Sequence, residues 1–231
     1  FPKIIAQNNT TPYHITYEKI KVNLFSSTIY ASNLVVIPKK KLKKSNIKIG
    51  IYSKIESITI TNYKLWNFLF DDIIKAESIT IENPKVILYK KNTKAINNPN
   101  SIRSQLFDPF QKIIVVSNIY LSKGTLAIIS TQTNQPILST TNISTVIEGI
   151  FIDKNTLKNK IPFVYNKYLF NCDSLYYKPN EFYRIKAANI RSSNHHLQIK
   201  NFEYLPEYSR SVFVQKIAKE KDLFTIKIKS F

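Results

Sequence analysis

Glycine, cysteine and methionine are almost missing from this chain of 231 residues, which contains 3 glycines, 1 cysteine and no methionine. So few glycines cannot supply the positive-φ turns of a compact β structure with many tight hairpins, nor a loop that cradles phosphate. Asn can replace glycine at many positions between strands, because Asn also tolerates the left-handed region. The single Cys172 excludes an internal disulfide, and its apolar surroundings predict a buried, inert thiol.

Acidic residues and long apolar runs are also scarce. The chain has 15 Asp and Glu against 34 Lys and Arg, a net charge of +19. This excess favours an anionic partner such as lipid head groups, acidic glycans or nucleic acid, although solubility and AT-rich codon usage explain it equally well. No apolar run approaches the ~20 residues of a membrane-spanning helix. With 43% hydrophobic and 21% charged residues, the composition is that of a folded, globular chain.

A phrase of seven residues occurs twice and organises the middle of the chain. Glu56–Asn62 reads Glu-Ser-Ile-Thr-Ile-Thr-Asn, and Glu77–Asn83 repeats it with six of seven positions identical. A short apolar run, Leu65–Phe70, lies between the copies, and its helical spacing predicts a short helix. Two similar strands around a helical turn indicate a sheet that grows by adding like units, with the isoleucines on one apolar face.

Alternation of apolar and polar residues predicts strands along most of the chain. A phase shift at Glu18–Lys19 indicates a β-bulge, and Asn83–Pro84 indicates a kink. We expect Lys123–Gly124 to form a turn between two arms, while Leu157–Cys172 is compatible with a helix. Strands are expected at 13–24, 28–37, 47–61, 73–91, 112–121, 126–128, 137–153, 173–177, 181–190, 196–205 and 223–231. The clearest helix is expected at Glu207–Lys221, with Ser209 or Ser211 as its N-cap.

A basic cluster follows the second strand. It consists of Lys39, Lys40, Lys41, Lys43 and Lys44. Near an anionic surface each lysine would contribute roughly 1 kcal/mol. A solvated loop between strands explains the same run, and the sequence favours that simpler interpretation.

No catalytic or metal-binding pattern is recognisable. His195 and His196 are adjacent, so on a strand they point to opposite faces and cannot easily share one metal ion. Asp71–Asp72 has no candidate nucleophile near it, and the chain has no P-loop or nucleophile-elbow motif. Many of the aromatic residues, such as Tyr13 and Tyr17, follow the apolar phase of their strands, so nucleic acid is not an expected partner. We therefore expect a protein without enzymatic activity and without a cofactor.

The order of these segments resembles that of the AsmA-like proteins, a family of the Gram-negative envelope related to TamB and to bridge-like lipid-transfer proteins. The resemblance covers most of the chain as a pattern of strands rather than as invariant residues. It is carried by Tyr13–Leu24, Thr28–Pro38, Ile55–Leu88, Pro206–Arg210 and Lys221–Phe224.

The resemblance implies a long, twisted, curled and mostly antiparallel sheet with a few short covering helices. It also implies a periplasmic location and tethering to the inner membrane by a segment outside this chain. Residues 1–12 would then be a linker after that anchor, and residues 13–231 one β-rich domain. A possible sub-boundary lies at the polar, lid-like segment 92–111.

The function that follows from the resemblance is lipid transfer or outer-membrane biogenesis, with acyl chains held on the apolar strand faces. Phospholipid or another anionic lipid, the membrane surface and other envelope proteins are the expected partners. The alternative is a structural subunit that binds protein through the same apolar face. Lys39–Lys44 would lie near head groups or the membrane surface. The candidate groove residues are Ile58, Ile60, Ile79, Ile81, Val86, Leu88 and Val116.

Overall fold

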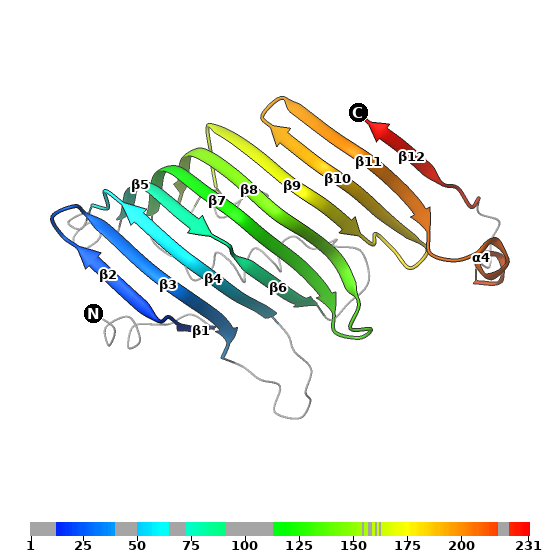
Figure 1. The fold of residues 1–231 in the computed structure, drawn as a ribbon, viewed down its shortest axis with the longest axis horizontal. Helices are drawn as coiled ribbons and strands as arrows, with labels where there is room; N and C mark the ends of the chain where they lie inside the picture. Colours follow the sequence, from blue (N-terminus) through cyan, green and yellow to red (C-terminus); the bar gives the residue numbers. More distant parts are fainter. Residues whose placement is uncertain are drawn as a thin grey trace.

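The computed structural model is mainly β, with one sheet of 12 strands and one short helix among the residues described (Figure 1). It describes residues 13–39, 50–64, 73–90, 113–153, 155–156, 159, 161, 163–216 and 222–231. The elements are β1 (Tyr13–Thr16), β2 (Lys19–Asn23), β3 (Thr28–Pro38), β4 (Gly50–Thr61), β5 (Ile73–Glu82), β6 (Lys85–Lys90), β7 (Ile113–Ser130), β8 (Pro136–Ile152), β9 (Lys167–Tyr177), β10 (Tyr183–Ser193), β11 (His196–Pro206), α4 (Arg210–Lys216) and β12 (Ile226–Ser230).

The sheet is open and follows the order of the chain. Its path is β1-β3-β4-β5-β7-β8-β9-β10-β11-β12, with β2 beside β3 and with β6 between β4 and β7. All neighbours are antiparallel except that β5 and β6 both run parallel to β7. β5 and β6 therefore occupy one position in the sheet, divided at Asn83 and Pro84 where a kink was expected.

The repeated phrase pairs with itself. Its two copies, Glu56–Asn62 and Glu77–Asn83, run antiparallel, so the start of each copy faces the end of the other. The side-chain amide of Asn83 donates to Glu56 at 3.0 Å, and that of Asn62 donates to Glu77 at 3.1 Å. The two copies of the repeat therefore pair with each other as a self-complementary antiparallel unit. The sequence alone indicates only that like units follow one another in the sheet.

Left-handed residues and carboxylates form a line across the sheet, here called the first polar row. Neighbouring members face each other in the strand registers or lie one residue from doing so. Six of them have positive φ, between 47° and 54°. Asn33 donates to Glu18, and Asn142 donates to Asp173 at 2.9 Å, as Asn83 does to Glu56. The members are Glu18, Asn33, Glu56, Asn83, Lys123, Asn142, Asp173, Asn189 and Asn201.

A second polar row crosses the central strands nearer the other end. It consists of Asn62, Glu77, Gly149 and Asn166, with positive φ at Asn62 (47°) and Gly149 (67°). A side chain at Gly149 would be strained at this φ, and its Cβ would meet the side chain of Asn166. The two rows lie at the two ends of the repeated phrase.

Each polar row reverses the alternation of its strands. Simple alternation would place residues three apart on opposite faces. Across the first row, however, Cys172 and Leu175 pack in one hydrophobic cluster, as do Ala187 and Ile190. Across the second row, Ile147 and Ile150 likewise share a cluster. At these crossings two consecutive residues interrupt the alternation, and the apolar residues on both sides of the row stay on one face.

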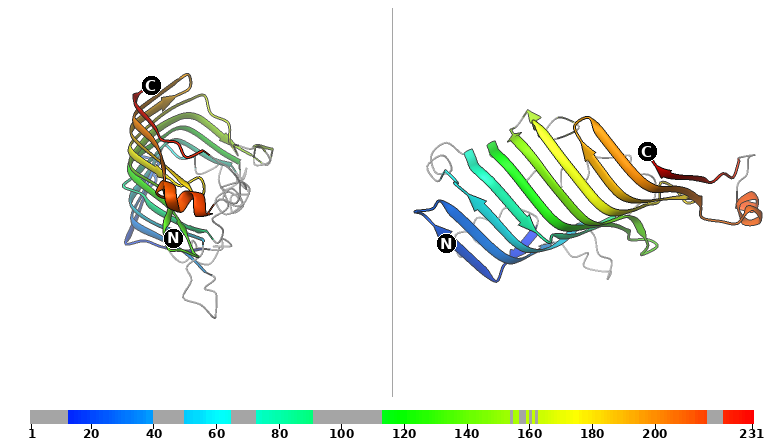
Figure 2. Two further views of the ribbon diagram at one scale, coloured as in Figure 1. Left: turned by 90° about the vertical axis from the view of Figure 1, so that its right-hand side faces the viewer. Right: turned by 45° about the horizontal axis from the view of Figure 1, so that its top comes forward.

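That apolar face is the concave one. Viewed along the sheet, the strands bend into a C, and α4 lies on its open side (Figure 2). Phe213 of α4 is 2% exposed and packs on Tyr183, which shares the phase of Ala187 in the apolar clusters. β-Bulges and left-handed residues bend strands, so the polar rows supply the curvature.

Several expectations from the sequence are wrong. Lys123–Gly124 is no turn, because β7 runs through it as one strand and Lys123 takes its place in the first polar row. The helix considered for Leu157–Cys172 is not seen in its described part, where β9 begins at Lys167 and pairs with β8. α4 is shorter than expected at its start, since its first residue is Arg210.

Other expectations hold or fall outside the described residues. The segment at Ile137–Asp153 is a single strand, and Ser209 directly precedes α4 with its carbonyl accepting from the Phe213 amide. Cys172 is buried. The expected linker 1–12, the helix at Leu65–Phe70, Asp71–Asp72 and the segment 92–111 all lie outside the residues that the structure describes.

Candidate functional site

The apolar face is the candidate site, and its centre lies between the two polar rows. Ile58 of β4 is the direct partner of Ile81 of β5, and Ile60 is the partner of Ile79. Ile79 in turn lies beside Ile119 of β7. Direct partners share a face, so the common apolar face expected for these four isoleucines is confirmed.

The other candidate groove residues extend the same face toward both ends of the strands. Val86 and Leu88 belong to a cluster with Ile51 and Ile128, on the far side of the first polar row. Val116 is 1% exposed and packs with Ile79 and other residues around the second row. The structure therefore places all seven candidates on one face, although in different clusters.

A pocket of about 440 Å³ opens on this face, where the segment that carries Phe163 and Tyr165 folds over β8 and β9. The rings of Tyr165 and Tyr168 meet edge to face with centroids 5.7 Å apart. The hydroxyls of Tyr168 and Ser192 hydrogen bond to each other at 2.9 Å, so they do not need a ligand. None of the described residues that line the pocket is charged. Its lining consists of Thr145, Ile147, Ile161, Phe163, Tyr165, Tyr168, Phe170 and Ser192.

An aromatic cluster covers the apolar face at the β12 end. Tyr183 stacks on Tyr204 at 4.7 Å, and Tyr204 stacks on Phe224 at 5.4 Å. Phe213 of α4 packs edge to face on Phe182 and Tyr183. Burial raises the pKa of Tyr204, with the neighbouring Tyr183 adding to the effect. Through these ring contacts the cluster holds α4 on the open side of the concave face (Figure 2).

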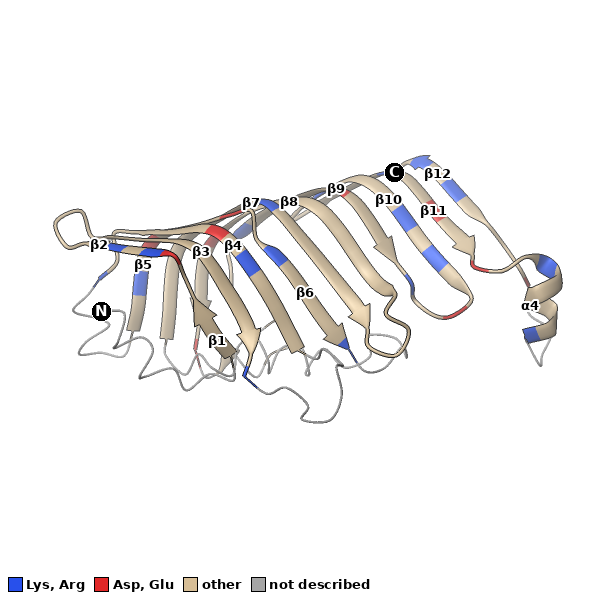
Figure 3. Ribbon diagram, turned by 60° about the horizontal axis from the view of Figure 1, so that its bottom comes forward, with Lys and Arg blue, Asp and Glu red and all other residues tan. Residues whose placement is uncertain are grey.

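Charged residues of the strands gather on the opposite face. Lys85 and Lys186 each precede an apolar-face residue, Val86 and Ala187, and so point the other way. Lys85 is the direct partner of Lys54. Figure 3 shows basic residues along much of the sheet. The lysines of these described strands are therefore separated from the surface that could hold an apolar ligand.

Of the basic cluster expected to contact head groups, the structure describes one residue. Lys39 is exposed just beyond the end of β3, and Lys40, Lys41, Lys43 and Lys44 lie outside the described residues. The contribution of this cluster stays a prediction.

Sequence reasoning missed the pocket because it treated Tyr165 and Tyr168 as possible helix residues. It also did not predict that the polar rows cross several strands in line, although single bulges were expected. The available signal was the spacing itself. Two apolar residues three positions apart, with two residues between them that are not apolar, recur at Val116–Ile119, Ile147–Ile150 and Cys172–Leu175, and each marks a crossing.

The described residues contain no group of three or more His, Cys, Asp and Glu side chains placed to hold a metal ion. None of their helices has the length and apolar character needed to cross a membrane.

Comparison with known proteins adds no family to this geometry. No protein-family model matches the chain, and no curated protein shows a significant match to it.

Proposed function

We propose that this protein holds the acyl chains of phospholipid or another anionic lipid along its concave apolar face and acts in lipid transfer without catalysing a reaction. The observation that carries the proposal is the continuity of that face across both polar rows, with charge kept on the opposite face. In the setting that the sequence resemblance implies, the protein is tethered at the inner membrane and serves outer-membrane biogenesis from the periplasm.

The chemistry of the face suits a tail rather than a head group. Each methylene moved from water to an apolar surface gains ~0.8 kcal/mol, so a tail needs no specific polar contact. The pocket beneath Phe163 and Tyr165 is lined by aromatic and aliphatic groups and has a volume within the usual range for ligand sites. Its hydroxyl pair is already satisfied internally.

The size of the sheet sets the expected stoichiometry. Ten strands lie along its path, and neighbouring strands are ~4.8 Å apart, which gives a face about 43 Å long. One acyl tail reaches across about half of a ~30 Å hydrocarbon core, or ~15 Å. Two or three tails can therefore lie end to end, which corresponds to one or two diacyl lipids per chain.

Native mass spectrometry of protein purified from membrane-containing cells tests this proposal. We expect one or two bound lipids per chain, and we expect Ile79→Lys to remove most of them because it places a charge on the apolar face. Thr80→Lys is the matched control, since Thr80 is the next residue and its partners Thr59 and Tyr120 lie on the opposite face. This control should retain its lipid.

Ser192→Phe provides a second test that does not add a charge. It fills the pocket with apolar bulk and should lower lipid occupancy while circular dichroism shows the β fold intact. Lipid-free wild-type protein, or equal loading of all variants, would contradict the proposal. If the apolar face instead cross-links to a stoichiometric protein partner, the chain is an interaction subunit.

A further inference from the structure

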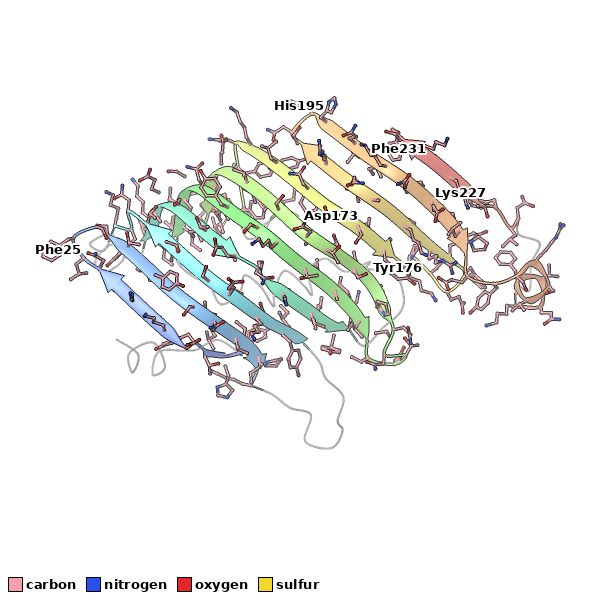
Figure 4. The ribbon with its side chains drawn as sticks, viewed as in Figure 1. Phe25, Asp173, Tyr176, His195, Lys227 and Phe231 are labelled. Carbon is pink, nitrogen blue, oxygen red and sulfur yellow. The ribbon has the colours of Figure 1, made fainter. Side chains whose placement is uncertain are left out.

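The turn between β2 and β3 presents two adjacent apolar side chains to solvent. Leu24 is 61% exposed and Phe25 is fully exposed at 104%. Phe25 extends from a corner of the sheet, away from every strand (Figure 4). Leaving such a side chain in water forgoes a large gain from burial, so a pair of them at a turn tip indicates a contact surface.

The tip is held in place by its own hydrogen bonds. The backbone amides of Phe25 and Ser26 donate to the side chain of Asn23 at 3.0 and 3.1 Å. The amide of Tyr63 donates to the carbonyl of Ser27 at 3.1 Å, which ties the turn to the end of β4. The exposure of Leu24 and Phe25 is therefore built into an ordered turn.

Three lysines flank the tip, and one described carboxylate, Glu77, lies near Lys64 because both bond to the side chain of Asn62. Lys19 and Lys21 of β2 are exposed, and Lys64 lies on the adjoining segment, where it donates to Asn62 at 2.9 Å. Residues 19–28 contain no acidic side chain. Adjacent aromatic and aliphatic groups with lysines set behind them match a bilayer interface that carries anionic lipid.

We propose that this tip inserts into the interfacial region of an anionic bilayer and fixes one corner of the sheet on the membrane. Leu24 and Phe25 enter the boundary between head groups and acyl chains, while Lys19, Lys21 and Lys64 contact the phosphates. The inference goes beyond lipid holding, because it concerns a surface outside the concave face and would stand even if that face bound protein.

Vesicle co-sedimentation tests the insertion, using phosphatidylcholine and phosphatidylglycerol in equal amounts. Leu24→Ser combined with Phe25→Ser should weaken binding about tenfold or more, since both side chains are exposed and their loss leaves the fold intact. Val214→Ser is the matched control, because Val214 is an apolar residue 66% exposed on α4, and it should leave binding unchanged. Lys21→Gln should weaken binding about fivefold at low salt.

Fluorescence separates insertion from attraction by the +19 charge alone. Phe25→Trp in a Trp66→Phe chain should shift its emission to the blue when these vesicles are added. Binding that survives the double serine change, disappears in high salt and gives no blue shift would overturn the proposal. Absence of wild-type binding would overturn it as well. Lipid loading measured in the same variants stays normal if only the tip has failed.

Discussion

At the scale of single residues, asparagine does in this protein what glycine does in most β structures. Among the described residues, seven of the nine non-glycine positions with positive φ are Asn, and most of these lie inside strands rather than in turns. Asn pays a small penalty in this region, and its amide can also bond across to the next strand. The bonds from Asn33, Asn62, Asn83 and Asn142 to carboxylates use that second property.

Asn142 offers a direct test of this role. Asn142→Gly keeps the backbone conformation and loses only an exposed hydrogen bond to Asp173, so the free energy of unfolding should change by about 0.5 kcal/mol or less. Asn142→Val forces a β-branched residue to φ 49° and should cost roughly 1–3 kcal/mol. Urea unfolding measures both. Equal stability of the two variants would show that the left-handed conformation at this position is not required.

At the scale of elements, α4 shows how a short helix is stabilised by one side chain. The described part of the helix has seven residues, a length that is not stable alone, and Phe213 is its buried residue. Phe213→Ala should cost about 3–5 kcal/mol, because it removes the ring that packs on Phe182 and Tyr183.

The neighbouring Val214→Ala is the control for α4 and should change stability by about 0.5 kcal/mol or less, since Val214 points to solvent. Hydrogen exchange should show loss of protection in α4 and at the adjoining ends of β10 and β11 in the Phe213 variant only. Unchanged protection there would mean that the helix is held by other contacts.

At the scale of the whole molecule, burial of tyrosines makes stability sensitive to alkaline pH. Burial raises the pKa of Tyr13, Tyr176 and Tyr204, and the nearby Glu207 raises that of Tyr176 further. In the unfolded chain these groups ionise near pH 10. The folded chain then binds more protons than the unfolded one, so stability falls as pH rises.

The stability supplied by the neutral tyrosines should be complete below about pH 10 and should be lost as pH rises through their folded pKa values. Urea midpoints measured on either side of pH 10 test this. Tyr204→Phe, which keeps the ring stack with Tyr183, should reduce the alkaline loss. A loss of the same size in this variant would assign the effect to other groups.

The mainly β class, most strand positions and the shared face of Ile58, Ile60, Ile79 and Ile81 could be read from alternation, because the period of a strand is local. The prediction of a turn at Lys123–Gly124 was wrong, because the residue types that favour the left-handed region are the same in a turn and inside a strand. The pocket could not be predicted, since it depends on how the segment before β9 folds back over β8 and β9, which no local residue pattern specifies.

The two edges of the sheet, at β1–β2 and at β12, never meet. A closed structure fixes its strand number, because every strand alters the circumference. In this open sheet the cross-section is set along each strand by the polar rows, and the number of strands sets only the distance covered. Inserting one more hairpin of the same pattern would lengthen the concave face by about 10 Å without altering its width or its lining chemistry. In proteins built this way, the length of the concave face can therefore change independently of its selectivity for a ligand.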